Sequence, residues 1–179
     1  MPSPIMPSGP IRLASRIARK ARRYVEVAEQ GLRFFPAAAE TLTAIAARWP
    51  VAINSGALRP EIEYSLRRMG CLDRVAAIVS AEDTNRCKPD PEGYRLAFEA
   101  LRNRERRGHN GDLDGLSPAA CLVIEDTLAG IISAKGAGMR AVGVSTTFSA
   151  EQLREAGADD VVESLAAFTP EWISHRFGH

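Results

Sequence analysis

Short apolar runs alternate with segments of helical periodicity along the chain, and this alternation limits the possible folds more than any other feature. The runs are only three to five residues long and almost wholly apolar, which is typical of strands buried on both faces. They predict an α/β fold, a three-layer Rossmann-like architecture with a parallel sheet between helices. We expect strands at residues 51–54, 75–79, 121–124, 141–144 and 160–162, helices at 37–48, 60–69, 91–102, 128–137 and 151–156, and a polar loop at 103–117.

The first 35 residues differ in composition from the rest of the chain. Residues 1–10 contain four prolines and are expected to form an unstructured leader. Residues 11–35 place apolar side chains at helical spacing beside several arginines, which predicts an amphipathic helix and a linker. An arginine-rich start without acidic residues is also typical of a mitochondrial transit peptide, an alternative that stays open. The α/β core is expected to span residues 36–179.

Composition argues against two classes of partner. The chain has 179 residues, of which 45% are hydrophobic and 25% charged, and its net charge of +1 favours no nucleic acid. No apolar run approaches the ~20 residues of a membrane span, so no membrane is expected. Three widely spaced cysteines without a C-x-x-C pair indicate reduced thiols, buried as small hydrophobic residues, in a cytoplasmic protein.

Polar residues stand at the positions where a parallel sheet binds ligands, beyond the carboxyl ends of its strands. The strand at 51–54 ends in Asn54-Ser55-Gly56, where a hydroxyl and a glycine amide are suited to phosphate oxygens. The alternative is that Ser55 caps the next helix. Lys88 lies between a cysteine and a proline just before another predicted helix. It is expected to neutralise phosphate charge or to lower the pKa of a nearby carboxylate. The alternative is a solvated surface lysine.

Glu125 and Asp126 directly follow the apolar strand at 121–124. Two adjacent carboxylates at a buried strand end are costly unless their charge is compensated. A hard divalent cation, Mg²⁺ in phosphate chemistry, provides this compensation through oxygen ligands. The alternative is that Asp126 caps the helix predicted at 128–137, and both roles are compatible.

In this order, Ser55, Lys88 and Glu125-Asp126 resemble the second, third and fourth motifs of the haloacid dehalogenase-like superfamily, in its phosphatase and phosphosugar-mutase branch. The stretches at residues 55–59, 88–94 and 124–131 carry this resemblance. It implies an Mg²⁺-dependent phosphatase or phosphomutase acting through an aspartyl-phosphate on a small phosphorylated metabolite. Ser55, Gly56, Asn54 and Lys88 would bind phosphate, with Ser55 and Lys88 assisting catalysis, and Asp126 and Glu125 would bind the metal. Residues 11–35 would correspond to a remnant cap helix and its linker, which normally reads Pro-Gly and here reads Pro36-Ala37.

The first motif of that superfamily, an apolar strand ending in Asp-x-Asp with the nucleophile as its first aspartate, has no counterpart before residue 36. Asp112-Leu113-Asp114-Gly115 spells the motif but follows a polar stretch, so a surface turn is expected there. We therefore expect the chain to be truncated and inactive alone. Its missing strand would lie between those at 51–54 and 121–124, where each unpaired backbone group costs about 1–3 kcal/mol.

Three arrangements would account for the absence of this strand. An amino-terminal segment is absent, the two neighbouring strands pair directly with each other, or a partner chain completes the sheet. A non-catalytic relative that keeps phosphate or Mg²⁺ binding is the main alternative function. A receiver-like phosphoacceptor domain is less consistent, because its acidic pair would close the first strand rather than a late one. Nothing in the sequence identifies the substrate.

Overall fold

The computed structural model of the chain describes residues 33–107 and 116–178. Residues 34–179 form one compact unit. The expected leader, most of the expected cap helix and the Asp112–Gly115 sequence lie outside the described residues. In the part of the chain that the structure describes, no helix is long and apolar enough to cross a membrane.

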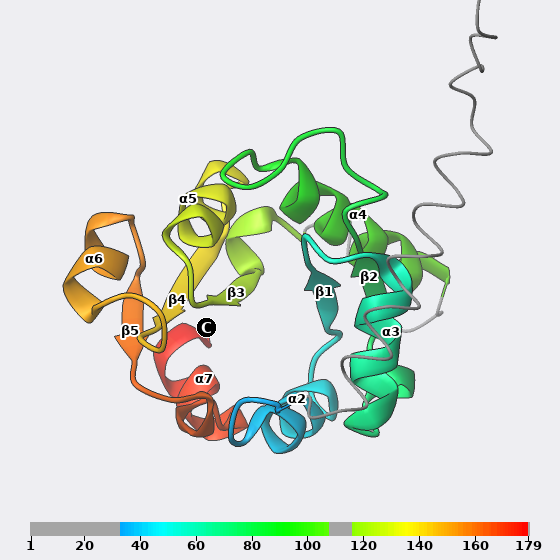
Figure 1. Ribbon diagram of the computed structural model, residues 1–179, viewed down its shortest axis with the longest axis horizontal. Helices are drawn as coiled ribbons and strands as arrows, with labels where there is room; N and C mark the ends of the chain where they lie inside the picture. The colour runs from blue at the N-terminus through cyan, green and yellow to red at the C-terminus, as the bar shows by residue number, and fades with distance from the viewer. Residues whose placement is uncertain (1–32, 108–115, 179) are drawn as a thin grey trace, which may run out of the picture. The chain divides into compact units, whose positions relative to one another are not determined.

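Strands and helices alternate along this unit, as the apolar runs predict (Figure 1). The helices and strands are α2 (Ala38–Ala46), β1 (Ala52–Asn54), α3 (Arg59–Arg68), β2 (Ala77–Val79), α4 (Glu92–Arg107), β3 (Leu122–Glu125), α5 (Leu128–Gly136), β4 (Arg140–Val144), α6 (Ala150–Glu155), β5 (Asp160–Val162) and α7 (Pro170–Phe177).

All strand pairs are parallel, but the described strands form two sheets rather than one. In the first sheet β1 pairs with β2, and Ile53 lies opposite Ile78. The second has the order β3-β4-β5, with Val123 opposite Ala141. Figure 1 shows β1 and β3 facing each other across the middle of the unit. The arrangement in which these two strands close directly on each other is therefore wrong.

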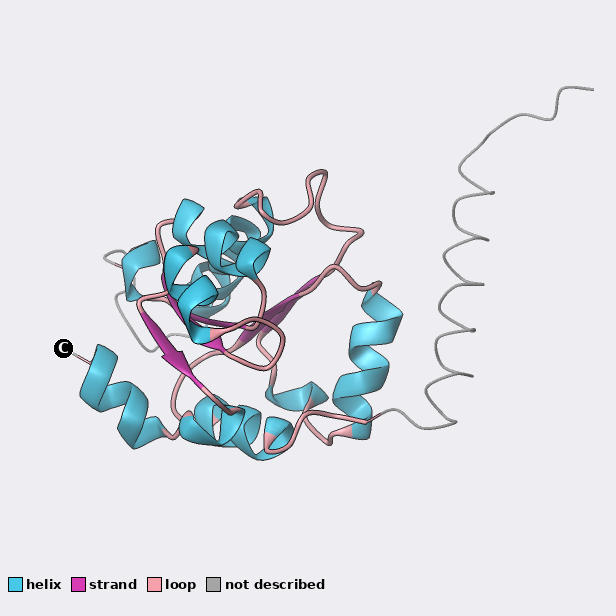
Figure 2. Ribbon diagram, turned by 60° about the vertical axis from the view of Figure 1, so that its left-hand side comes forward, coloured by secondary structure: helices cyan, strands magenta, loops and turns pink. Residues whose placement is uncertain are grey.

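Helices cover both faces of the strands, which confirms the three-layer α/β architecture (Figure 2). Successive residues of β4 pack against different helical layers, since successive side chains of a strand point to opposite faces. Ala141 packs in a cluster with residues of α4, α5 and α6. Val142 and Val144 pack instead with Phe168 and with Ile173 of α7.

Two segments differ from the sequence-based expectations. Helix α4 runs to Arg107, five residues beyond the expected end at 102, so the first part of the expected loop is helical. Helix α7 was not expected at all, although its start has two clear signals. Thr169 accepts a hydrogen bond from the Trp172 amide, and Pro170 occupies the first helical position, which are frequent features of helix starts.

The turn before α2 places a non-glycine residue in the left-handed region, since Ala37 has φ 63° and ψ 6°. This conformation costs an L-residue about 1–2 kcal/mol, more than the entropy that a glycine loses on folding. We expect Ala37→Gly to stabilise the chain by about 0.5–1 kcal/mol, measured by urea unfolding. Ala44→Gly, inside α2, is the control and should destabilise by a similar amount. Equal effects of the two substitutions would contradict this account of Ala37.

Candidate active site

Lys88 joins the carboxyl ends of the two sheets. Its ammonium group donates to the backbone oxygen of Asn54 at 3.2 Å, at the end of β1. The same group forms an ion pair with Glu125 at the end of β3. The Lys88 side chain is 26% exposed and that of Glu125 only 9%. The alternative of a solvated surface lysine is therefore wrong, and three of the predicted site residues are in contact.

Glu125 is held from several sides within this site. The Tyr94 hydroxyl of α4 donates to its Oε1 at 2.6 Å, and the Thr127 hydroxyl donates to its Oε2 at 3.0 Å. Its carboxylate lies where a Cβ on Gly130 would stand, so only glycine leaves room for it. Glu125 is therefore held in one position by Lys88, by Tyr94 of α4 and by Thr127, the residue before α5.

These contacts determine the pKa of the Glu125 carboxyl. Burial alone would raise its pKa, but the Lys88 charge and hydrogen bonds from Lys88, Tyr94 and Thr127 outweigh burial and lower it. Burial and then the Glu125 charge raise the pKa of Tyr94. Glu125 is therefore a carboxylate anion and Tyr94 a neutral phenol at neutral pH.

Ser55 and Gly56 follow β1 directly and lie in a loop before α3, which begins at Arg59. Ser55 Oγ accepts a hydrogen bond from the Ala57 amide at 3.1 Å. Ser55 is thus not the cap of α3, which the alternative interpretation required. The Gly56 amide donates to no other described residue. This amide remains available to an anion at the end of β1.

Asp126 points to a different neighbour than Glu125. Its Oδ2 accepts a hydrogen bond from the Thr147 hydroxyl at 2.8 Å, in the loop after β4. Thr127, and not Asp126, caps α5, because Thr127 Oγ1 accepts from the Gly130 amide. The capping interpretation of Asp126 is wrong, and its carboxylate lies beside the next strand of the sheet.

Sequence reasoning missed Tyr94, Thr127 and Thr147. Tyr94 and Thr127 stand within the stretches at 88–94 and 124–131 that carry the family resemblance, but no rule of spacing assigned them a contact. Thr147 follows β4 by three residues. The one sequence feature that indicated a site role for Thr147 was its position among the polar residues that follow a strand.

The lowered pKa of Glu125 predicts acid sensitivity. A carboxyl with a lower pKa in the folded chain contributes stability above its unfolded value, 4.5, and loses it as the pH falls through the folded value. We expect the free energy of unfolding to decrease as the pH falls below 4.5. Glu125→Gln should show a smaller decrease over the same range, measured by urea unfolding at successive pH values. A parallel decrease in both proteins would assign the effect to other groups, such as Asp83 or Asp159, whose pKa values are also lowered.

The fold and this site define an α/β protein with lysine, carboxylates and a hydroxyl at the carboxyl end of parallel strands. The sequence model of the haloacid dehalogenase-like hydrolases matches residues 9–138, which is more than half of the chain. The chain therefore belongs to the haloacid dehalogenase-like hydrolase family.

Two of the relatives are phosphatases by name, and each is matched over part of its length. Validoxylamine A 7'-phosphate phosphatase of Streptomyces hygroscopicus subsp. limoneus is 37% identical over 109 residues, 61% of this chain and 45% of the relative. Phosphoglycolate phosphatase of Escherichia coli K12 is 27% identical over 150 residues, 82% of this chain and 54% of the relative. The chain thus spans about half the length of these two relatives.

Solved structures show the same fold. CbbY from Rhodobacter sphaeroides in complex with phosphate superposes with a TM-score of 0.69 at 23% identity, covering 97% of this chain and 73% of that one. β-Phosphoglucomutase from Clostridium difficile gives a TM-score of 0.63 at 23% identity, covering 80% and 56%. At these identities the likeness establishes the architecture alone.

Proposed function

We propose that this chain forms the substrate-phosphate side of a phosphohydrolase that acts on a small phosphorylated metabolite. The observation that supports it most is the Lys88–Glu125 pair beside the end of β1, in which the Glu125 side chain is only 9% exposed and that of Lys88 26%. Ser55 Oγ and the Gly56 amide would bind phosphate oxygens, and Lys88 would neutralise their charge. Both phosphatases named above act on phosphorylated small molecules by their names, which agrees with this class of substrate.

Mg²⁺ fits the donors at this site only in part. Asp126 and Glu125 provide adjacent carboxylates, the hard oxygen ligands that Mg²⁺ prefers. Among residues 33–107 and 116–178, no cluster of three or more His, Cys, Asp or Glu side chains could hold a metal ion. Asp126 would bind the ion and Glu125 would stand beside it. The ion would supply charge stabilisation for the phosphate, with its other ligands from water, the substrate and further polypeptide.

The nucleophile is the part of the proposed reaction that the described residues do not provide. Glu125 is paired with Lys88 and hydrogen-bonded on both oxygens, and Asp126 is bonded to Thr147. We therefore expect the chain alone to bind phosphate but not to turn over a phosphate ester. Loss of a nucleophile from a cooperating catalytic set costs on the order of 10⁴–10⁶ in rate.

The test measures binding and turnover separately on the purified chain. We expect phosphate to bind to the chain, and ³¹P NMR measures this binding. Ser55→Ala or Lys88→Met should weaken the binding of phosphate. Lys135→Met is the matched control. Lys135 pairs with Asp159, which accepts from the Ala141 amide near the start of β4, at the end of the strand opposite to the site, so this substitution should leave phosphate binding unchanged. p-Nitrophenyl phosphate with Mg²⁺ should not be hydrolysed above background.

Two results would contradict the proposal. The first is the absence of phosphate binding, or an equal loss of phosphate binding in Lys135→Met and Lys88→Met. Either would contradict the proposed phosphate site. Robust turnover that Asp126→Ala abolishes would show that the chain contains its own nucleophile. Binding without turnover supports the phosphate site, and recovery of turnover after an upstream Asp-x-Asp strand is added would favour the hydrolase over a non-catalytic relative.

A further inference from the structure

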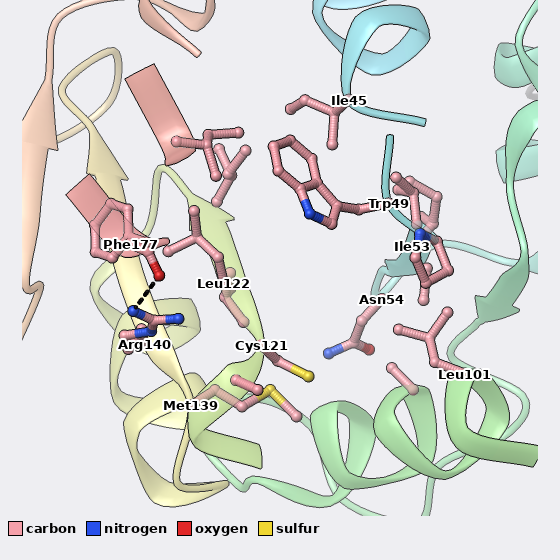
Figure 3. A pocket seen from close by; sticks show the side chains of 18 of the residues that line it. Ile45, Trp49, Ile53, Asn54, Leu101, Cys121, Leu122, Met139, Arg140 and Phe177 are labelled. Carbon is pink, nitrogen blue, oxygen red and sulfur yellow. Dashed lines mark hydrogen bonds between the residues drawn. The ribbon is translucent and has the colours of Figure 1, made fainter. Parts of the chain in front are cut away.

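The loop that carries Ser55 and Gly56 takes its support from one side of β1. On the other side a cavity of about 760 Å³ separates β1 from β3, at the place where the missing strand is expected. Figure 3 shows the Asn54 side chain, at the end of β1, pointing into this space. Residues 55–58, the phosphate loop, therefore depend for their position on β2, which pairs with β1, and on the segment that follows β2.

Backbone hydrogen bonds join the phosphate loop to the end of β2 and to the residues after it. Ser55 N donates to Val79 O at 2.9 Å, and Ala81 N donates to Ala57 O at 3.0 Å. Ala57 N in turn donates to Ser55 Oγ at 3.1 Å. The peptide groups on both sides of the Gly56 amide are thus held in place, which fixes the direction in which this amide points.

One carboxylate folds the segment after β2 into the turn that makes these contacts. Asp83 Oδ2 accepts hydrogen bonds from the Ser80 amide and from the Ser80 hydroxyl, both at 2.7 Å. The Asp83 amide donates back to the Ser80 backbone oxygen at 3.1 Å. These bonds close residues 80–83 into a turn in which Ser80 is only 1% exposed, and they direct the Ala81 amide at the phosphate loop.

The same turn also holds the residue that follows the phosphate loop. Asp83 Oδ2 forms an ion pair with Arg59 at 2.8 Å, and the Arg59 guanidinium donates to the Ile78 backbone oxygen at 3.0 Å. Glu82 accepts a hydrogen bond from the Arg59 amide at 2.9 Å. The phosphate loop is therefore held before Gly56 by β2 and after Gly56 by the turn.

Three donors converge on one oxygen of Asp83. Hydrogen bonds from the hydroxyl and the amide of Ser80 lower the pKa of the Asp83 carboxyl most, and the Arg59 charge lowers it further, against the opposing effect of burial. Asp83 is therefore an anion at neutral pH. Its charge is used inside the protein and does not face the proposed phosphate.

We propose that Asp83 is a positioning residue of the phosphate site, which fixes the directions of the Gly56 amide and the Ser55 hydroxyl through the turn at residues 80–83. It touches no ligand itself. The inference rests on the proposed function, since it names what positions the phosphate-binding groups of that same site.

The bonds within the turn matter more for this role than the ion pair does. The side chains of Asp83 and Arg59 are 38% and 41% exposed, and ion pairs between exposed side chains contribute little. Because all three donors bind the same carboxylate oxygen, the amide oxygen of an asparagine at position 83 can accept from Ser80 in its place. Asp83→Asn should therefore keep the turn and lose only the charge.

The test compares phosphate binding to the full chain and its variants by ³¹P NMR. Asp83→Ala removes the acceptor that closes the turn. It should weaken phosphate binding about tenfold or more, the typical cost of losing a group that orients a ligand-binding residue. Asp83→Asn should rescue the site and bind phosphate within about threefold of the wild type.

Asp159→Ala is the matched control for a purely structural effect. Asp159 also accepts from a backbone amide, that of Ala141, and pairs with Lys135 through a side chain that is 35% exposed. These contacts lie near the start of β4, at the end of the strand opposite to the site. Asp159→Ala should lower the free energy of unfolding in urea about as much as Asp83→Ala, but it should leave phosphate affinity unchanged.

Hydrogen exchange gives a second readout that needs no phosphate. The Ala57 amide is bonded to Ser55 Oγ and should be protected from exchange in the wild type. In Asp83→Ala we expect it to exchange about tenfold faster, because the phosphate loop has lost its support. In Asp159→Ala and in Asp83→Asn its rate should stay close to that of the wild type.

Four results would overturn the inference. Unchanged phosphate affinity in Asp83→Ala, beside normal binding by the wild type, would overturn it alone and leave the phosphate site in place. Equal losses of affinity in Asp83→Ala and Asp159→Ala would assign the effect to general loosening of the fold. A loss in Asp83→Asn as large as that in Asp83→Ala would assign it to the charge and not to the turn. Absence of phosphate binding to the wild type would overturn this inference together with the proposed function.

Discussion

Gly130→Ala is expected to destabilise the chain by about 3 kcal/mol, measured by urea unfolding. A Cβ on Gly130 would overlap the Glu125 carboxylate. That carboxylate ends a flexible side chain, but it is almost wholly buried and bound by Lys88, Tyr94 and Thr127. Any movement that relieves the overlap breaks these contacts and leaves the Lys88 charge without its carboxylate partner.

Gly136→Ala is the matched control, because Gly136 ends the same helix and a Cβ there would meet Pro91 Cβ at an ordinary 3.4 Å. This substitution should be neutral or stabilise by up to about 1 kcal/mol through helix propensity. In a Glu125→Ala background the cost of Gly130→Ala should largely disappear, since its collision partner is gone. Equal costs of Gly130→Ala in both backgrounds would show that the overlap with Glu125 is not the cause.

The meeting of Lys88 with Glu125 could be predicted from the sequence because it depends on topology. Parallel strands bring their carboxyl ends to one edge of a sheet, and each residue stands next to a recognisable strand or helix start. The contact did not require the identity of any distant neighbour. Asn54 followed from the same reasoning, since it is the last residue of β1.

Contacts between side chains of different elements could not be predicted in this way. The position of Tyr94 on Glu125 depends on how α4 packs against β1 and β3, which local periodicity does not determine. The capping of α5 by Thr127 rather than Asp126 is similar, because the two adjacent residues have comparable capping preferences. Only the backbone conformation at the strand end decides which side chain reaches the Gly130 amide.

The sequence indicated that a strand of the sheet is missing, but it did not indicate which arrangement the fold adopts. The apolar runs at 51–54 and 121–124 indicated two strands without a common partner, and three arrangements could resolve this. In the structure the two strands stay apart. Helix α4 contacts β1 and β2 and also packs with α5 against residues of β3 and β4. Sequence patterns indicate the two strands but do not encode the distance between their edges.

Lys88→Met should destabilise the chain by about 2–3 kcal/mol at pH 7. The substitution keeps most of the length and apolar character of the side chain but leaves the Glu125 charge buried without its cation. Burial then dominates, so the pKa of Glu125 should rise instead of being lowered. The loss should shrink as the pH falls and Glu125 takes up a proton. Urea unfolding of the variant and the wild type between pH 7 and pH 4 measures both effects.

Lys135→Met tests whether removing any paired lysine has the same effect. Lys135 binds Asp159 at 2.7 Å, but both side chains are 35% exposed, and such pairs contribute at most about 1 kcal/mol. Lys88→Met combined with Glu125→Gln should recover most of the lost stability, because the neutral amide accepts from one of the Tyr94 and Thr127 hydroxyls and its NH2 group donates to the other. A double variant as unstable as Lys88→Met alone would show that the lysine stabilises the chain through packing or through Asn54, and not through the charge of Glu125.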